Sequence, residues 1–525
     1  MKDRVLCIYC LEELDPNLSK CPHCGNLIAK SRSVFSYLQR CERRSLHPST
    51  EYISKRYGIS IAQAEQVLNA YSDTNDDEYQ FSKLNTIIKE IRVKNLFNYL
   101  NYNVRLNENV SIILAPNGFG KTTLFNLANF VLVPSLETYE TYIKGIPFES
   151  FEIVLVNDTR ISLGQTHYQN DEKEGQIFSF IITKADGETA DGTFDFKNID
   201  IDSDDSYDEQ KQFSERESLI KEMKGMLSRM DVWSDVFFIR TNRAFADPKN
   251  FVYNDRYSRN ARAHGIKEPD YFVDPIISCN DDLTSMMKKC KNAYQELIEG
   301  VKNTIASDFL RIEVPDLSFT EFKTALKEYR TKVNELVQFG LLSEQDNDSL
   351  KVINSISEAD YNDMMLGKGA FLSLYVEKYS KTLEPFGDLY SKMETFRSII
   401  NERNTGTKKH IEYSLRGIEY YNGEQLIPLD SLSSGEKNDF IMFFDLIFRI
   451  RNKSIILIDE PEISLHINWQ EKYIDNVLRA LKNKSCQIII STHSPDIISN
   501  HDDYISDINI DGQSEGEDLE EEDAD

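Results

Sequence analysis

A strand-to-helix turn at residues 112–123, IILAPNGFGKTT, constrains the fold of this chain more than any other feature. Three apolar residues predict a buried strand, and the pattern LFNLANFVL after the turn predicts a helix. Backbone N–H groups in such a turn, together with the positive end of the helix, bind phosphate groups. The spacing fits G-x-x-x-x-G-K-[ST], except that Ala115 takes the first glycine position. We therefore predict a nucleotide-binding loop in which Ala115 keeps a negative φ.

The residues of this loop have separate roles in phosphate binding. Lys121 can reach the β- and γ-phosphates, and Thr122 can hold Mg²⁺. The alternative is a glycine-rich turn that joins the strand to the helix by chance and binds no phosphate. The predicted nucleotide-binding residues are Asn117, Gly118, Phe119, Gly120, Lys121, Thr122 and Thr123.

Composition limits the cellular setting and the partners. The 525 residues suffice for two to four domains. Apolar runs are too short to cross a membrane and no signal peptide is evident, so we expect a cytoplasmic protein without membrane contact. The net charge of −27 is uneven, because residues 501–525 hold 12 acids and leave −15 for the rest. Any contact with nucleic acid must therefore be local.

Four cysteines near the N-terminus form two C-x-x-C pairs at a spacing typical of Zn²⁺ sites. Cys7, Cys10, Cys21 and Cys24 can present four thiolates to the metal, and the metal would then supply the folding energy of so short a segment. Unrelated reduced cysteines or a redox pair are the alternatives. We predict a zinc-ribbon-like module over residues 1–30.

A small helical segment and a polar linker are predicted over residues 31–80. Within it, residues 51–71 resemble a helix-turn-helix. The second helix lacks Lys and Arg, which favours packing or protein contact over DNA reading.

Strands are predicted over 84–114, 149–156, 160–163, 176–183 and 236–245 within an N-terminal lobe, 81–280. The acidic stretch 186–209 is expected to be a mobile surface loop. Residues 240–267 alternate Arg and Lys with aromatic residues. That chemistry suits contact with DNA or RNA, a protein interface, or a plain solvated face, and the sequence leaves all three open.

Residues 281–403 are helical by pattern and lack a sustained heptad repeat, so a compact helical insertion is expected. Strand signals return in a C-terminal lobe, 404–500, where Asn422-Gly423 marks a tight hairpin. Residues 501–525 are expected to be an acidic, disordered tail of low complexity.

Three further motifs follow the insertion. Residues 432–437, LSSGEK, open a helix for which Ser433 is a plausible N-cap. An apolar strand then ends in Asp459 and Glu460, and a second apolar strand ends in a polar cluster that contains His493. Ligand sites lie at the carboxyl ends of parallel strands in open α/β sheets.

These four motifs, in this order, resemble the ABC-type ATPase superfamily, and most closely its branch of SMC-like, RecF-like and OLD-like ATPases. The resemblance implies an α/β head with a mixed sheet around the phosphate loop, an antiparallel β subdomain and a helical insertion. It implies ATP and Mg²⁺ as ligands, with Mg²⁺ at Thr122 and Asp459, Glu460 as general base and His493 as γ-phosphate sensor. Ser433, Ser434, Gly435 and Glu436 would act in trans, within a homodimer or a larger homo-oligomer. A Q-loop glutamine is not assigned among Gln165, Gln169 and Gln176.

Two functions remain open. The chain resembles stand-alone ATPases of prokaryotic anti-phage systems of the Septu, retron or PARIS kind, which implies control of a separate effector, a nuclease being expected. Fewer than forty residues follow His493, too few for the Toprim nuclease that OLD-type proteins often carry there. The alternative is a DNA-repair ATPase that clamps DNA between two ATP-bound heads. A transport ATPase is disfavoured by the zinc motif and the long insertion.

Overall fold

The computed structural model places the chain in two compact units, residues 1–84 and 85–525. In the first unit, strands β1 (Val5–Leu6) and β2 (Glu13–Leu14) pair antiparallel. The cysteine pairs and the segment 51–71 lie outside the described residues. The structure describes residues 5–6, 13–14, 34, 86–170, 173–198, 206–232, 234–240, 274–311, 318–343, 368–404, 406–465 and 467–510.

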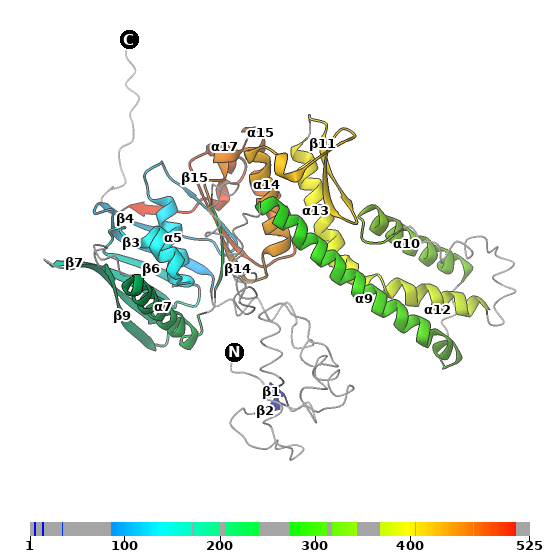
Figure 1. Ribbon diagram of the computed structural model, residues 1–525, viewed down its shortest axis with the longest axis horizontal. Helices are drawn as coiled ribbons and strands as arrows, with labels where there is room; N and C mark the ends of the chain where they lie inside the picture. The colour runs from blue at the N-terminus through cyan, green and yellow to red at the C-terminus, as the bar shows by residue number, and fades with distance from the viewer. Residues whose placement is uncertain are drawn as a thin grey trace, which may run out of the picture. The chain divides into compact units, whose positions relative to one another are not determined.

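A four-stranded parallel sheet of order β10-β14-β15-β5 organises the second unit (Figure 1). Every residue of β14 and β15 is buried, as expected for strands that are covered on both faces. The register pairs Asp459 with Ser491 and Thr492 with Leu114, so three strands end side by side. The strands are β5 (Val110–Leu114), β10 (Asp235–Ile239), β14 (Ser454–Asp459) and β15 (Gln487–Thr492).

A seven-stranded antiparallel sheet of order β16-β4-β3-β6-β7-β8-β9 forms the predicted β subdomain. Helix α5 (Lys121–Leu132) shares one apolar core with this sheet and with one face of the parallel sheet, through residues such as Phe125, Ile153 and Leu457. The strands are β3 (Ile88–Leu96), β4 (Leu100–Arg105), β6 (Ser150–Leu155), β7 (Arg160–Asn170), β8 (Lys173–Thr183), β9 (Thr189–Asn198) and β16 (Ile508–Ile510). Short helices α6 (Leu136–Thr138) and η1 (Tyr139–Ile143) follow α5.

The prediction of a disordered tail over residues 501–525 was wrong for residues 501–510. Strand β16 pairs antiparallel with β4, so backbone hydrogen bonds to the sheet order this part of the chain in spite of its acids.

The acidic stretch 186–209 is not the surface loop that we expected. Strand β9 pairs with β8 along its length, and helix α7 (Ser206–Arg229) begins within the stretch. Phe194 and Phe196 are buried, and the Phe196 ring lies 4.2 Å from that of Tyr139 between centroids. The expectation was wrong because two phenylalanines at strand spacing outweigh the acids that alternate with them on the other face.

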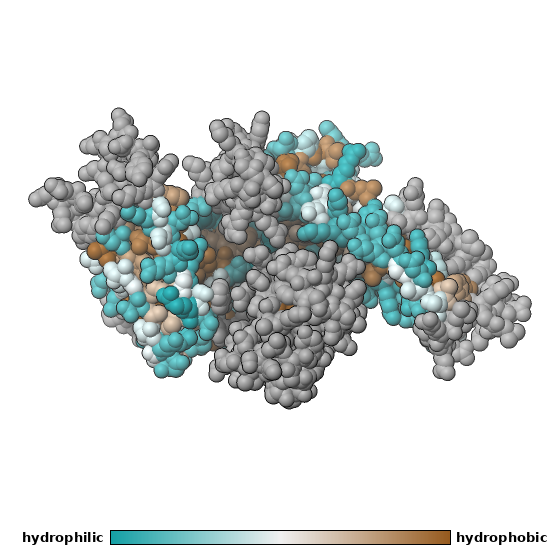
Figure 2. Space-filling model, turned by 60° about the horizontal axis from the view of Figure 1, so that its bottom comes forward, coloured by the Kyte–Doolittle hydropathy of each residue, from teal (hydrophilic) through white to brown (hydrophobic). Residues whose placement is uncertain are grey.

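The helical insertion begins at Pro275 and is elongated, in contrast to the compact shape that we expected. Helix α9 has 37 residues, about 55 Å at 1.5 Å per residue; α12 packs against it, and α10 packs against α12 (Figure 1). Apolar residues at helical spacing, from Ile276 through Leu283 and Met287 to Tyr294, bury one side of α9. The region of α9 is mainly hydrophilic in Figure 2. The elements are α9 (Pro275–Arg311), α10 (Phe319–Gln338), α12 (Lys368–Lys381), η6 (Glu384–Phe386) and α13 (Gly387–Arg403).

A small antiparallel sheet, β11 (Lys409–Ser414), β12 (Gly417–Asn422) and β13 (Gln425–Ile427), follows the insertion. The predicted hairpin is confirmed, because Asn422 pairs with Gln425 and Gly423 has a φ of 63°. Only glycine adopts such a turn conformation at little cost.

Helix α14 (Ser434–Phe444) covers the other face of the parallel sheet, where Phe440 and Phe444 share a core with Ile456 and Ile490. The parallel sheet thus separates two cores, with α5 on one side and α14 on the other. Within the described residues, no helix has the length and apolar character needed to cross a membrane. The remaining elements are η7 (Leu429–Ser431), η8 (Asp445–Arg449), η9 (Pro461–Ser464), α15 (Ile467–Gln470), α16 (Tyr473–Ala480), α17 (Pro495–Ile498) and η10 (Asp502–Tyr504).

Candidate nucleotide-binding site

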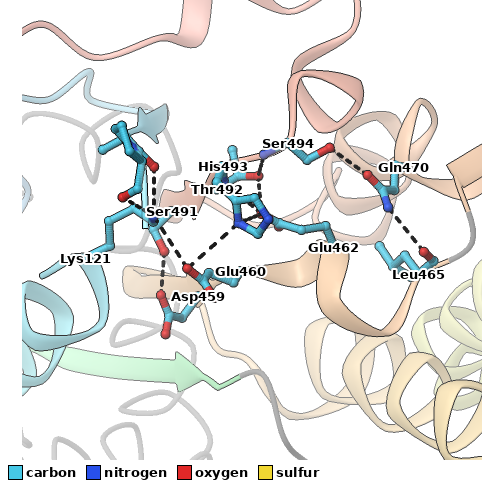
Figure 3. A network of polar contacts seen from close by, with 12 residues as sticks. Lys121, Asp459, Glu460, Glu462, Leu465, Gln470, Ser491, Thr492, His493 and Ser494 are labelled. Atoms are coloured by element: carbon cyan, nitrogen blue, oxygen red, sulfur yellow. Dashed lines mark hydrogen bonds and ion pairs between the residues drawn. The ribbon is translucent and has the colours of Figure 1, made fainter. Parts of the chain in front are cut away.

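Three loops meet at the carboxyl edge of the parallel sheet. The phosphate loop follows β5, Glu460 follows β14, and His493 follows β15. Figure 3 shows Lys121, Glu460 and His493 facing one another in this place. The structure therefore brings together residues that lie more than 370 positions apart in sequence, as the parallel-strand argument predicts.

The phosphate loop has the backbone that anion binding requires. Gly118 and Gly120 have φ values of 86° and 72°, which are favourable only for glycine. A Cβ atom on Gly120 would lie 3.0 Å from Leu96 Cδ2 and 3.2 Å from Phe97 Cε2, so a side chain at this position would also press against its neighbours. Ala115 is not among the residues with a positive φ, which satisfies the condition set by its replacement of glycine.

Lys121 is buried and folds back over the loop that precedes it. Its Nζ donates hydrogen bonds to the carbonyl oxygens of Ala115, at 2.8 Å, and Pro116, at 3.0 Å. The same Nζ lies 3.5 Å from Glu460 Oε1. The ammonium group is thus held at the mouth of the loop, where phosphate oxygens could replace the carbonyl groups as its partners.

Thr122 and Asp459 form the predicted pair for Mg²⁺. Thr122 Oγ1 donates to Asp459 Oδ2 at 2.7 Å, close to the ~2.9 Å that separates neighbouring oxygens around Mg²⁺. Ser491 Oγ donates to Asp459 Oδ1 at 2.5 Å. Burial raises the pKa of the Asp459 carboxyl, and the bonds from Ser491 and Thr122 oppose that shift. The buried Asp459 carboxylate and the exposed Thr122 hydroxyl are hard oxygen donors that fit this ion.

Glu460 directly follows β14 in a left-handed conformation, with φ 42°. A non-glycine residue in this region stores backbone strain, which occurs preferentially at functional sites. Its backbone N–H is held by Ser491 O at 2.9 Å. The side chain is 20% exposed and its Oε1 lies 3.5 Å from Lys121 Nζ, so a water molecule has access to the carboxylate.

Glu462 is a residue of the site that sequence reasoning missed. It is buried, and its Oε1 accepts hydrogen bonds from Thr492 Oγ1 and from the backbone N–H of His493, both at 2.8 Å. His493 Nδ1 lies 2.9 Å from the same oxygen. The three acids within residues 459–462, Asp-Glu-Pro-Glu, were the sequence feature that could have indicated it. Their spacing alone does not show which acid contacts the loop that contains His493.

The predicted in-trans residues stand at the start of α14. Ser433 is the N-cap, as predicted, and forms a capping box with Glu436, whose Oε2 accepts from Ser433 N at 3.0 Å and Ser433 Oγ at 2.7 Å. Lys409 Nζ donates to Glu436 Oε1 at 2.6 Å. Ser433 and Ser434 are exposed, so this helix terminus is open to a partner.

Other predicted residues fall outside the site or outside the described part of the chain. The described start of the basic segment, Arg240, packs over the rings of Tyr142 and Phe238 and donates to Asn126, so it belongs to the head. Residues 241–273 and the four cysteines are outside the described residues. Gln165 and Gln176 contact Phe148 and Tyr139, within the β subdomain.

Fold and site together define a P-loop nucleotide-binding protein of the α/β class. Residues 87–498 match the model of a family described as "AAA ATPase domain". Because that match covers most of the chain, the protein belongs to this ATPase family.

The curated relatives include "Retron Vc95 probable ATPase" of Vibrio cholerae serotype O1 biovar El Tor. It is 23% identical over 239 residues, which are 42% of this chain and 42% of the relative. The chain therefore matches less than half the length of this relative. The predicted resemblance to ATPases that include a retron ATPase is confirmed by the family match and by this relative.

Similar solved structures include Smc head domains. One is the Smc head with an extended coiled coil bound to the C-terminal domain of ScpA from Pyrococcus furiosus, at 13% identity, covering 81% of this chain and 96% of that one, with a TM-score of 0.33. Another is the Smc head with a coiled coil and joint from Pyrococcus yayanosii, at 14% identity, 80% and 96% coverage, and a TM-score of 0.31. TM-scores this low mean that the backbones superpose only in part, so no function follows from them.

Proposed function

We propose that this protein binds ATP with Mg²⁺ and hydrolyses it at the carboxyl edge of the parallel sheet. The observation that carries the proposal is the convergence of Lys121, the Thr122–Asp459 pair, Glu460 and His493 on one place. Thr122 and Asp459 would hold Mg²⁺, and the ion would neutralise part of the negative charge of the nucleotide's phosphates. Lys121 binds the β- and γ-phosphates, Glu460 orients the attacking water and accepts its proton, and His493 contacts the γ-phosphate.

The completed site is proposed to need a second copy of the chain. Ser433, Ser434, Gly435 and Glu436 lie on α14, across the parallel sheet from α5, and Ser433 and Ser434 are exposed. A helix N-terminus that faces outwards with free N–H groups suits the phosphate of a nucleotide bound to another subunit. Two heads would then enclose two ATP molecules, and dimerisation becomes part of catalysis.

Two serine variants separate helix capping from contact in trans. Ser433→Ala should lower the free energy of unfolding by about 1 kcal/mol and also lower ATP turnover. Ser318→Ala is the matched control, because Ser318 forms the same capping box with Glu321 on α10. It should cost similar stability and leave turnover unchanged. Urea unfolding and steady-state ATPase assays provide the readouts, and equal turnover losses in both variants would refute a role in trans for Ser433.

The output is proposed to be the control of a separate effector protein, a nuclease being expected, in anti-phage defence. The support is the partial similarity to a retron ATPase. The second candidate is a DNA-repair ATPase, supported by the Arg-rich and aromatic segment that follows Arg240 in the sequence. Charge reversal at Arg256, Arg259 and Arg262 separates them. If it abolishes salt-dependent DNA binding and activity together, effector control is refuted; if function persists while an associated nuclease depends on the ATPase, repair is refuted.

The N-terminal cysteines are proposed to hold a structural Zn²⁺ ion. The support is the spacing of Cys7, Cys10, Cys21 and Cys24, which is typical of four-thiolate sites. Cys21→Ser should reduce bound zinc from about one ion per chain to near zero, as measured by elemental analysis of the purified protein. Cys486→Ser is the control, because Cys486 is remote in sequence and donates to Arg451 O. Unchanged zinc in Cys21→Ser would refute the site.

A further inference from the structure

Glu462 is a buried carboxylate that the proposed hydrolysis does not yet use. Within the described residues, Glu462 Oε1 accepts hydrogen bonds from the Thr492 hydroxyl and the His493 backbone N–H, and His493 Nδ1 lies 2.9 Å from the same oxygen. Its side chain is only 4% exposed, and Oε2 makes no hydrogen bond within the described part of the chain. A buried, half-satisfied carboxylate is costly to fold, so a functional reason for its presence is worth seeking.

The distances show which acid is the partner of His493. Nδ1 lies 2.9 Å from Glu462 Oε1 and 3.9 Å from Glu460 Oε1. Only the first is within hydrogen-bond range. Figure 3 shows the imidazole ring between the two acids. Glu460 therefore remains available to water and to Lys121, while Glu462 takes the histidine.

We propose that Glu462 is a positioning residue for His493, which holds the proton on Nδ1 and directs Nε2 to the nucleotide. A carboxylate can only accept, so this contact requires a hydrogen on Nδ1. The hydrogen bond at one ring nitrogen decides which chemistry the other can perform. This inference rests on the proposed role of His493 as the γ-phosphate contact.

A second contact holds the loop after β15, this time through Ser494. Ser494 Oγ donates to Gln470 Oε1 at 2.6 Å, and Gln470 Nε2 donates to Leu465 O at 3.2 Å. The residues around His493 are thus joined at two points to the segment that follows β14. The imidazole, which is 39% exposed, is held in one orientation without being enclosed.

The competing explanation is that Glu462 only stabilises the turn through Thr492 and the His493 backbone. The tautomer of His493 distinguishes the two, because a purely structural role does not require the proton on Nδ1. The tautomer is read from the ¹⁵N chemical shifts of selectively ¹⁵N-histidine-labelled protein without nucleotide. The His493 signal is assigned by its loss in His493→Asn.

Wild-type protein should show His493 protonated at Nδ1. Glu462→Gln should keep this tautomer, because an amide oxygen still accepts from Nδ1. Glu462→Ala should lose it and should lower kcat by about 10- to 100-fold with ATP affinity unchanged, as expected when the partner that orients a histidine is removed. Glu412→Ala is the matched control, because Glu412 Oε1 lies 3.5 Å from His410 Nε2 on the exposed surface of β11. It should change neither quantity.

Wild-type tautomer or wild-type kcat in Glu462→Ala would overturn the proposal. If Glu462→Ala does not fold, Glu462→Gln decides: loss of the Nδ1–H tautomer there overturns the proposal, and its retention supports it. The tautomer is measured without ATP, so its outcome stays separate from that of the proposed hydrolysis. Absence of all ATP turnover in the wild type would refute the proposed hydrolysis. The Glu462–His493 contact would then still be tested by the ¹⁵N chemical shifts of His493.

Discussion

Glu460→Gln protein should bind Mg·ATP as tightly as the wild type and hydrolyse it about 100-fold more slowly, or slower still. The amide keeps the shape of the side chain but cannot accept a proton from water, and removal of a general base costs about 10²–10⁴ in rate. Because ATP stays bound, the variant should also accumulate as a dimer or a larger assembly. Single-turnover kinetics and light scattering with and without ATP provide the measurements.

Glu424→Gln is the control for this prediction. It makes the same chemical change at an exposed turn of the β12–β13 hairpin, so turnover and assembly should equal those of the wild type. Equal turnover in Glu460→Gln and the wild type would refute the role of Glu460 as base. It would not affect the binding roles of the phosphate loop.

Lys121→Ala should abolish nucleotide binding at concentrations that saturate the wild type. The ammonium group would lose charge-assisted hydrogen bonds to phosphate, each worth about 1.5–3 kcal/mol. Two such bonds correspond to about a 100-fold or greater loss of affinity. Calorimetric titration with a non-hydrolysable ATP analogue measures this loss directly.

Lys121 is also buried and bonded to Ala115 and Pro116, so its removal must be separated from unfolding. The thermal unfolding curve of the variant without nucleotide gives that check. Lys482→Ala, at an exposed position after α16, should retain full affinity. Wild-type affinity in a folded Lys121→Ala protein would contradict the phosphate-loop assignment.

The sequence alone predicts which residues of the candidate site lie together, because each part of the site is local in sequence. The phosphate loop, the acids after β14 and His493 each follow a short apolar run of the length that predicts a buried strand. Parallel strands align their carboxyl ends, so the meeting of these loops follows from the strands themselves. The capping role of Ser433 is likewise encoded within four residues.

Other features depend on contacts that the sequence does not show. Strand β9 lies in an acidic stretch, and its place in the sheet follows from Phe194 and Phe196, which pack against the aromatic cluster around Tyr139. Glu462 and Gln470 face His493 and Ser494 only because η9 and α15 turn back towards β15. No motif spacing predicts such a contact between two loops.

The shared site is the central claim, and complementation between two inactive variants tests it most directly. Lys121→Ala removes the phosphate loop of one copy, and Ser434→Arg blocks the exposed start of α14 in another. Each variant alone should be inactive. The two variants are co-expressed, each with its own affinity tag. A mixed dimer carries one intact composite site out of two, and random pairing of equal amounts makes about half of the dimers mixed. The co-expressed mixture should therefore recover about a quarter of wild-type ATP turnover. Purified mixed dimers without any turnover, or full activity of Ser434→Arg alone, would contradict a site built from two subunits.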